Sequence, residues 1–469
     1  MTAQLKLVRR ADLTNPIADI SSLSLFNYED GFSLTRDGWH PAIAHDGDTS
    51  VAEVMTLHVK SDVGQDDLMS IIRALDVKLK EVDWYKHSIE KYGVWLRVQL
   101  PYESNAYQAL LLNGDSEFTA SLFAPPVSPG NFLHGGYGLA VERIPWWESP
   151  YNQIYSASTI NCLGGMGSYG IVFGDFPSRI ARTSFRGAAG GGTGDLYEFW
   201  MGFRTDRFGD QANFVPLWDL GQSNDSTPSN DTTSTGDATA QGGYKWLCTF
   251  GDESELERVS MALLSFTSNY NDQRGEYTVL LRAKVDASTV CHVRLKDGFI
   301  ATSELRSQPR VKVDSTSWLL HPLGIITVPP SRGVLDASWL GQFGLELWAS
   351  RTSGSGNLHM DCIILIPRGE GFIHVSGGAV KYWLGDRRPI EVRMFPEGGG
   401  SGWWYQQHQI TGAIMPHTSV KIESENYTLP VGAGSLILAG QRETEHVLTD
   451  YIDVWLYNYQ RYRTPRGAG

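Results

Sequence analysis

The stretch from Gly275 to Arg368 constrains the fold of this chain most strongly, because its residues follow the patterns of β-strands. Tyr277–Val285 alternates apolar side chains with polar ones such as Arg282 and Lys284, and this period of two predicts a half-buried strand. Leu358–Pro367 ends in residues that are apolar on both faces and is too short for an ordinary helix, so it predicts a central strand covered on both sides.

Between these two strands lie further short runs of β-branched and aromatic residues, at Arg310–Asp314, Leu323–Val328 and Phe343–Ala349. Turn-forming segments separate them, including Pro329-Pro330 and Ser353–Gly356. Short strands joined by tight turns are typical of an antiparallel sandwich. Charged residues make up only 19% of the chain, whereas Gly (50), Trp (15) and Tyr (20) are abundant, and this composition favours strands over long surface helices.

One segment breaks the β pattern and predicts an amphipathic helix over Asp66–Tyr85. Asp66 and Asp67 place negative charge in its first turn, where the helix dipole favours it. Arg73, Asp76, Lys78, Lys80 and Glu81 are expected to occupy the polar face. The apolar residues recur at helical spacing: Leu68, Ile71, Ile72, Leu75, Leu79 and Val82. The predicted fold class is therefore all-β, mainly antiparallel β-sandwiches, with one amphipathic helix in the N-terminal domain.

A length of 469 residues indicates two to four domains. We expect an N-terminal β domain with the helix over residues 1–150, a jelly-roll or galectin-like sandwich over 151–374, and a C-terminal β domain over 375–469. The low-complexity tracts Gly187–Gly194 and Gln222–Gly243 are expected to be exposed loops, either a solvated insertion or a recognition surface. They flank the predicted strand Tyr197–Arg204.

Charge and hydropathy limit the possible partners. A formal net charge of −13 argues against binding to a phosphate backbone, so no nucleic acid is expected. No run of 18 apolar residues occurs, and the first ten residues lack the pattern of a secretion signal, so we expect no membrane insertion and synthesis in a cytoplasm. The cysteines at 162, 248, 291 and 362 show no metal-binding spacing and are expected to be buried, reduced thiols.

The usual enzyme signatures are absent, and neither catalytic residues, cofactor nor metal is expected. The G-x-G-x-x-G match within Gly164–Gly170 precedes strand and turn residues, whereas a dinucleotide site needs a helix there. His359 and Asp361 share one strand face as a possible hydrogen-bonded pair or metal edge, although a buried polar pair or a solvent-facing strand explains them better. Paired glycosidase carboxylates follow no spacing rule, so these remain open: Glu142, Glu148, Asp175, Asp195, Glu198 and Glu346.

Aromatic side chains are the other candidates, because flat rings can stack on sugars. Neighbouring residues of a strand point to opposite faces, so at least one Trp of each adjacent pair is expected in a core or a subunit interface. The wider set includes Trp200, Trp218, Trp246, Trp318 and Trp348. The residues predicted to contact a glycan or another subunit are Trp146, Trp147, Trp403, Trp404 and Tyr405.

The order of these elements resembles that of distal tail or tail-tip proteins of long-tailed, siphovirus-like bacteriophages. The resemblance rests on the helix Asp66–Tyr85 after the strand Val54–Val59, on a first region ending near Arg143–Glu148, on the middle region Phe173–Pro367, and on the Tyr- and Arg-rich segment Tyr457–Arg466. It implies a jelly-roll or galectin-like middle module, and it supplies no catalytic residues.

The resemblance also implies a role and partners. The chain would be a structural component of a virion tail, forming a three- or six-fold homo-oligomeric ring with tail tube and hub proteins as neighbours. Residues 1–150 would form the ring, and the closing basic run Arg461–Arg466 would lie on a surface or against another subunit. Two alternatives stay open: a carbohydrate-binding sandwich that adsorbs to a host-surface glycan, and a glycan-degrading enzyme on the same type of fold.

Overall fold

The computed structural model of the chain is built almost entirely of antiparallel β-sheets, with one α-helix among the residues that it describes, so the predicted all-β class is confirmed. The residues described are 4–10, 19–34, 39–45, 47–59, 65–85, 93–101, 104–112, 136–150, 152–187, 196–205, 216–220, 226–228, 232–250, 257–264, 275–299, 305–328, 343–368, 372–376, 390–397, 401–408, 414–416, 421–424, 428–429 and 431–465.

The chain divides into two compact units. Unit 1 comprises Met1–Asn152, Val172–Ala181 and Asn458–Gly469, and unit 2 comprises Gln153–Ile171 and Arg182–Tyr457. Each unit therefore contains segments that are far apart in the sequence. The two units group residues that are packed together and do not test the predicted domains. The three-domain division at residues 150 and 374 therefore remains a prediction.

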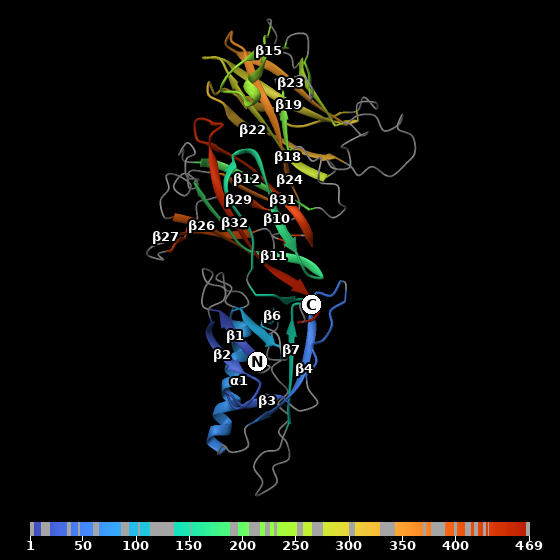
Figure 1. Ribbon diagram of the computed structural model, residues 1–469, viewed down its shortest axis with the longest axis vertical. Helices are drawn as coiled ribbons and strands as arrows, with labels where there is room; N and C mark the ends of the chain where they lie inside the picture. Colours follow the sequence, from blue (N-terminus) through green and yellow to red (C-terminus); the bar gives the residue numbers. More distant parts are fainter. Residues whose placement is uncertain are drawn as a thin grey trace, which may run out of the picture. The chain divides into compact units, whose positions relative to one another are not determined.

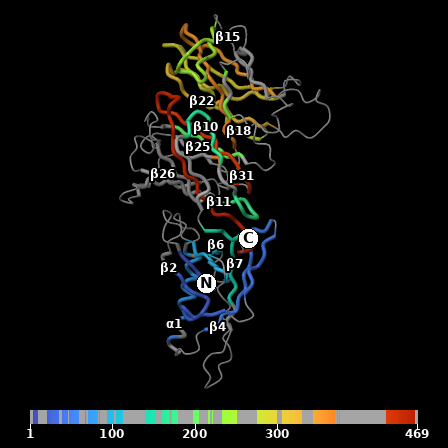
Figure 2. Tube along the Cα trace, in the orientation of Figure 1, coloured from blue at the N-terminus to red at the C-terminus, as the bar shows by residue number. Residues whose placement is uncertain are grey.

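Unit 1 contains a sheet with the strand order β2-β1-β5-β6-β8 and a second sheet with the order β3-β4-β7. The last residues of the chain's final strand join the first sheet, because Arg461 and Tyr462 pair with Glu148 and Trp147. In Figure 2 the red end of the tube accordingly enters the blue N-terminal unit. The elements are β1 (Gln4–Arg10), β2 (Asp19–Ser24), β3 (Phe32–Leu34), β4 (Val51–Val59), α1 (Gln65–Tyr85), β5 (Val94–Gln99), β6 (Ala106–Leu110), β7 (Gly136–Arg143) and β8 (Trp147–Glu148).

Helix α1 matches the predicted helix to within one residue. Leu75, Leu79 and Val82 are buried in one cluster with residues of both sheets, as the helical spacing predicts. Lys78 differs from the expectation, because it is buried on the packed side. Its ammonium donates to Ser21 Oγ at 2.5 Å and pairs with a carboxylate one turn away, and these contacts compensate for the desolvation of the charge.

A buried ion pair links two neighbouring strands of the second sheet of unit 1. Arg143 in β7 donates to Glu53 in β4 through Nε at 2.7 Å, and its guanidinium lies over the Trp147 ring at 4.5 Å. The other carboxylate oxygen of Glu53 accepts from Trp39 Nε1 at 2.8 Å. Arg143 and Glu53 are 0% and 1% exposed, so the pair exists away from water only because its hydrogen bonds are satisfied.

Unit 2 is built around three sheets, which we name after one strand each. The β12 sheet has the order β10-β31-β12-β25-β29, the β18 sheet has the order β15-β16-β24-β18-β22 with β13 also on β24, and the β19 sheet has the order β14-β17-β23-β19-β20 with β21 also on β19. Three further strands are added to the part of β11 that lies in this unit: β26 pairs with β11, β27 with β26, and β28 with β27. In Figure 1, β19, β22 and β23 lie together.

The strands from residue 152 onward run as follows: β9 (Asn152–Asn161), β10 (Leu163–Val172), β11 (Phe176–Gly187), β12 (Leu196–Thr205), β13 (Leu217–Asp219), β14 (Ser226–Pro228), β15 (Thr232–Gly236), β16 (Tyr244–Cys248), β17 (Glu257–Leu264), β18 (Gly275–Val285), β19 (Val290–Phe299), β20 (Arg306–Ser307), β21 (Val311–Val313), β22 (Leu319–Val328), β23 (Phe343–Ser353), β24 (Leu358–Pro367), β25 (Ile373–Ser376), β26 (Ile390–Glu397), β27 (Ser401–His408), β28 (Ile414–Pro416), β29 (Lys421–Ser424), β30 (Thr428–Leu429), β31 (Gly432–Arg442) and β32 (Tyr451–Tyr462). A 3-10 turn, Gln241–Gly243, precedes β16.

The β18 and β19 sheets share one large hydrophobic core. Every residue of β24 is buried, and β24 lies at the centre of its sheet, which confirms the predicted central strand. The prediction for Tyr277–Val285 was partly wrong. Thr278, Leu280 and Arg282 are buried as well as the apolar face, so β18 is covered on both sides rather than half-buried.

The G-x-G-x-x-G match forms strand β10, as expected from its context. Gly164 has a φ of +66°, and a Cβ on Gly165 would lie 2.3 Å from the carbonyl oxygen of Asn161, so the turn between β9 and β10 requires these glycines. Residues 188 to 194 of the predicted loop Gly187–Gly194 lie outside the described residues.

Candidate functional site

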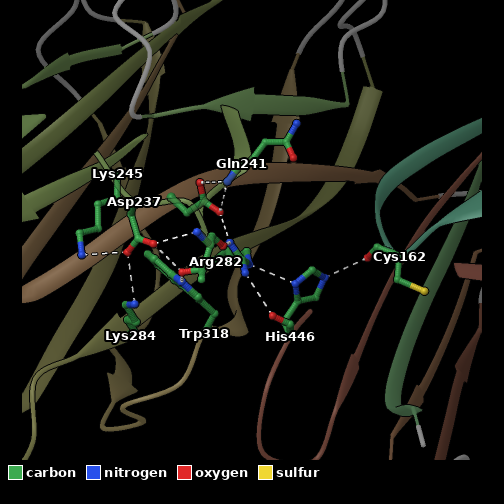
Figure 3. Close-up of polar contacts among 10 residues, drawn as sticks. Cys162, Asp237, Gln241, Lys245, Arg282, Lys284, Trp318 and His446 are labelled. Carbon is green, nitrogen blue, oxygen red and sulfur yellow. Dashed lines mark hydrogen bonds and ion pairs between the residues drawn. The ribbon is translucent and has the colours of Figure 1, made fainter. Parts of the chain in front are cut away.

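A buried polar network in unit 2 centres on Arg282 of β18 (Figure 3). Its guanidinium forms an ion pair with Asp361 of β24 and donates to the carbonyl oxygen of Thr239 at 3.1 Å. Nε donates to His446 Nδ1 at 3.0 Å, and the group lies 4.7 Å from the centroid of the Trp318 ring. Arg282 and Asp361 are 1% and 0% exposed, so this is a fully desolvated pair with its hydrogen bonds satisfied.

Asp237 adds two lysine side chains, Lys245 and Lys284, to the network (Figure 3). Its carboxylate pairs with Lys245 at 2.9 Å and with Lys284 at 3.4 Å. Burial alone would raise the pKa of Asp237, but hydrogen bonds from Thr239 and Lys245 and the charge of Lys284 outweigh burial and lower that pKa. Lys284 also lies 4.4 Å from the centroid of the Trp318 ring, so a single ring contacts two cations.

His446 is held neutral within this network. Burial, and then the positive charge of Arg282, lower its pKa to about 3. Because Nδ1 accepts a hydrogen bond from Arg282, Nε2 carries the proton and donates to the carbonyl oxygen of Cys162 at 3.4 Å. Burial likewise raises the pKa of the Cys162 thiol, and all four cysteines are buried and free, as predicted.

The network corrects one expectation from the sequence. The low-complexity tract Gln222–Gly243 was expected to be an exposed loop, but it contains strands β14 and β15. Its end is not solvated either, because Ala240 is 2% exposed and the N–H of Gln241 donates to Asp361 at 2.9 Å. Composition predicted exposure, whereas the buried carboxylate attracts these backbone groups. Because these hydrogen bonds join β18, β24 and the loops of Thr239 and His446, the network is suited to holding strands and loops together.

His359 and Asp361 do not form a pair. The β18–β24 register shifts at this point, since Arg282 pairs with Cys362 and Ala283 with Met360, and Asp361 has its own partner in Arg282. His359 Nε2 instead contacts Asp286 Oδ1 at 2.8 Å. Among the described residues, no three His, Cys, Asp or Glu side chains are arranged to hold a metal.

The outer face of the β19 sheet has a different character. Here β19 and β23 bring three cross-strand pairs to one side: His292 opposite Ser350, Arg294 opposite Trp348, and Lys296 opposite Glu346. The intervening residues of both strands point into the core. We call the six residues of these pairs the outer patch.

Trp348 is the centre of the outer patch. Its indole N–H donates to Glu346 Oε2 at 2.8 Å, and the Lys296 ammonium lies 3.4 Å from the centroid of its ring. These two contacts fix the orientation of the indole, which is half-buried. Glu346 was an open carboxylate in the sequence, and the structure makes it a partner of Trp348.

Three buried atoms of the outer patch have no hydrogen-bond partner: His292 Nδ1, Arg294 Nε and Ser350 Oγ. Arg294 also forms no ion pair among the described residues, although it is only half-exposed. Buried polar atoms are normally paired, because leaving one unpaired costs about 1–3 kcal/mol. The outer patch therefore combines an oriented aromatic ring with three polar atoms for which the described part of the chain supplies no hydrogen-bond partner.

Sequence reasoning had named Trp348 in its wider aromatic set but missed Arg294 and Lys296. The signal was present, since His292, Arg294 and Lys296 alternate with Val293 and Leu295 along β19. Only the strand register shows that this basic row faces Trp348.

The two predicted aromatic residues in unit 1 have unlike positions. Trp147 is 0% exposed and belongs to the core, where its ring contacts Arg143 and Trp39. Trp146 is half-buried, and Arg461 lies 4.1 Å from the centroid of its ring. One of the adjacent tryptophans is thus in the core, as the alternation rule predicts.

The C-terminal basic run was expected on a surface or another subunit, but its first residues pack within unit 1. Arg461 pairs with Glu148 at 3.6 Å as well as contacting Trp146. Tyr462 is 8% exposed, and the N–H of Arg463 donates to Asp175 at 2.8 Å. Two of the open carboxylates, Glu148 and Asp175, therefore hold this segment.

The remaining candidates are placed only in part. Trp403, Trp404 and Tyr405 lie in β27 and pair with Phe395, Met394 and Arg393 of β26, whereas their side chains lie outside the described residues. The other open carboxylates have these positions: Glu142 accepts from Ser50, Glu198 contacts His374 at 3.0 Å and Gln441 at 2.8 Å, and Asp195 lies outside the described residues. No helix among the described residues has the length and hydropathy to span a membrane.

No family model and no curated protein matches the chain. Among solved structures, the CBM22-1 and GH10 modules of a Clostridium thermocellum xylanase, complexed with xylohexaose, are similar at 11% identity and a TM-score of 0.21 over 36% of this chain, and the match covers only 28% of that chain. A tandem CBM22 domain of Paenibacillus barcinonensis is similar at 10% identity and a TM-score of 0.24, over 52% of this chain and 96% of that one.

A structure of infectious bursal disease virus, strain Gx, is similar at 9% identity and a TM-score of 0.17, over 68% of this chain and 82% of that one. These neighbours include carbohydrate-binding modules and a virus, but all three TM-scores are too low to carry weight for the function of this chain.

Proposed function

We propose that this chain is a structural component of a bacteriophage tail, a distal tail, tail-tip or baseplate ring protein that acts through subunit interfaces without catalysis or a cofactor. Its partners would be further copies of itself and the tail tube and hub proteins, and its location the virion. The observation that carries the proposal is the distribution of exposed apolar side chains. Of eight such large residues among those described, six lie in unit 1: Tyr28, Ile43, Val54, Val77, Trp84 and Phe173.

The outward face of β4 is the clearest of these surfaces. Ala52, Val54 and Thr56 point outward, and Val54, which is 70% exposed, lies opposite the exposed Ala140 of β7. Sheet faces in water usually carry long charged side chains, whereas Ala52, Val54, Thr56 and Ala140 are small and uncharged, although Glu142 lies opposite Ala52 on the same face. Such a face suits contact with another subunit.

Helix α1 presents a second apolar surface. Val77 and Trp84 are seven residues apart, hence on one side of the helix, and are 48% and 63% exposed. The opposite side of the helix packs on its own unit through Leu75, Leu79 and Val82. This second exposed apolar surface in unit 1 supports the proposal that residues 1–150 form the ring.

The test is the mass of the purified protein in solution, by light scattering after size exclusion. Val54→Glu and Trp84→Glu should each shift the assembly to smaller species, because a charge would be buried in the interface. Tyr244→Glu in unit 2 is the matched control, since Tyr244 is 48% exposed and is expected to have no effect. Assemblies that withstand both unit 1 changes would contradict the proposal.

A second function, carbohydrate binding by unit 2, is favoured by the outer patch. An oriented, half-buried Trp348 beside unpaired polar groups offers both stacking and hydrogen bonds to a sugar. Loss of binding to host polysaccharide on Trp348→Ala would support this site. Loss on Trp403→Ala or Trp404→Ala would instead favour the contacts predicted from the sequence.

A further inference from the structure

The side chains of the outer patch indicate the charge of the ligand that it would bind. His292, Arg294 and Lys296 occupy alternate positions of β19, so their side chains leave one face at intervals of about 7 Å. The only carboxylate that the described residues of β19 and β23 place on this face is Glu346, which accepts from Trp348. The other acidic residue, Asp297, points inward and accepts from Gln308 at 2.9 Å.

Arg294 is the residue that most needs an external partner. Arg143 and Arg282, whose side chains are almost fully buried, each have a carboxylate in contact. Arg294 is half-buried, its Nε has no acceptor, and no carboxylate pairs with it among the described residues. A guanidinium withdrawn from water without a counter-charge is unfavourable, and a bidentate anion such as carboxylate or phosphate would satisfy it.

We propose that the outer patch binds an anionic polysaccharide, with Arg294 and Lys296 contacting carboxylate or phosphate groups along the polymer and Trp348 contacting a sugar ring. This inference rests on the carbohydrate-binding function proposed above. It adds that the ligand is negatively charged and names the residues that bind its charged groups. The formal net charge of the chain is −13, so long-range attraction would not bring such a polymer to the protein, and selectivity must come from this local basic row.

The test measures binding of the full chain to three polymers by biolayer interferometry. Polygalacturonate carries a carboxylate on each sugar, its methyl ester has the same sugars without charge, and phosphorylated dextran carries phosphates on otherwise uncharged sugars. We expect binding to one or both anionic polymers, weakened by added salt, and little binding to the ester. The anionic polymer that binds more tightly identifies the source of the charge.

Two substitutions address the basic row directly. Arg294→Gln and Lys296→Gln should each weaken binding to the anionic polymer about tenfold or more, the size expected when a hydrogen bond between charged groups is lost. Lys80→Gln makes the same change in net charge on the exposed side of α1 and should leave the affinity unchanged. Thermal unfolding of each variant shows whether the fold is retained. If Arg294→Gln does not fold, Lys296→Gln decides the question.

Two outcomes would overturn the proposal in distinguishable ways. If the methyl ester binds as tightly as the acid, Arg294→Gln has no effect and Trp348→Ala abolishes binding, the outer patch binds carbohydrate but does not select for charge. If none of the three polymers binds, both this inference and carbohydrate binding at the outer patch fail, while the assembly proposal for unit 1 is unaffected.

Discussion

Arg282 and Asp361 show what a single residue contributes to this fold. Both are buried, and removing one charge leaves the other without compensation. We expect Asp361→Asn to destabilise unit 2 by about 3–5 kcal/mol, measured by urea unfolding. Replacing both residues, as in Arg282→Met with Asp361→Leu, should cost much less, because no charge remains buried. A single variant as stable as the natural chain would show that the network is dispensable.

His446 gives the same network a pH dependence. Its pKa is about 3 in the folded chain and near the ordinary value of 6.5 when unfolded, so the unfolded state binds the extra proton between these values. Stability should therefore fall as pH decreases from about 6.5 toward 3, by up to about 1.4 kcal/mol per pH unit from this residue.

His446→Gln keeps a polar side chain at this position. It should lower the slope of the unfolding free energy against pH between about 3 and 6.5 by the amount that one bound proton contributes. His321 and His359 also have lowered pKa values and contribute in the same direction, so some slope will remain. An unchanged slope in the variant would mean that His446 is not held neutral by Arg282 and burial.

At the scale of elements, periodicity predicted some of the strands in which side chains alternate, but it missed β19. Tyr277–Val285 was predicted within the observed bounds of β18, because one face of this strand lies in a core and its side chains follow the alternating pattern. The burial of Arg282 could not be read in this way. It depends on the backbone of Thr239 and on the loop of His446, far away in the sequence, which cover β18.

The candidate site was predictable to a similar extent. Trp348 stood out as an aromatic residue in a strand, but pairing with Arg294 depends on the register of β19 and β23. Trp147 was chosen for its residue type, and its place in the core depends on contacts with Trp39 and Arg143.

The segment Asp237–Gly243 offers a test at this scale, because its composition predicts an exposed loop. The N–H groups of Ala240, Gln241 and Gly243 all donate to acceptors within the chain. We expect slow hydrogen exchange at these amides. Asp361→Asn should speed exchange at Gln241, whose acceptor is that carboxylate. Rapid exchange of all three amides in the natural chain would contradict the observed hydrogen bonds.

For the whole molecule, the two units suggest that assembly and ligand binding belong to different parts of the chain. Unit 1 carries most of the exposed apolar side chains, whereas unit 2 carries the outer patch and the satisfied charge network. Assembly and recognition would then be separable, and substitutions in one unit should leave the other function intact. Arg294→Gln should assemble like the natural chain, and Val54→Glu should still bind glycan, as size exclusion and interferometry would show.

The most direct measurement of the central claim is the mass and symmetry of the purified chain, by light scattering followed by negative-stain class averages. The assembly account predicts a closed ring with three- or six-fold symmetry and a central opening, whose mass is the corresponding multiple of 52.0 kDa. A monomer at every concentration tested, including in the presence of tail tube protein, would contradict it.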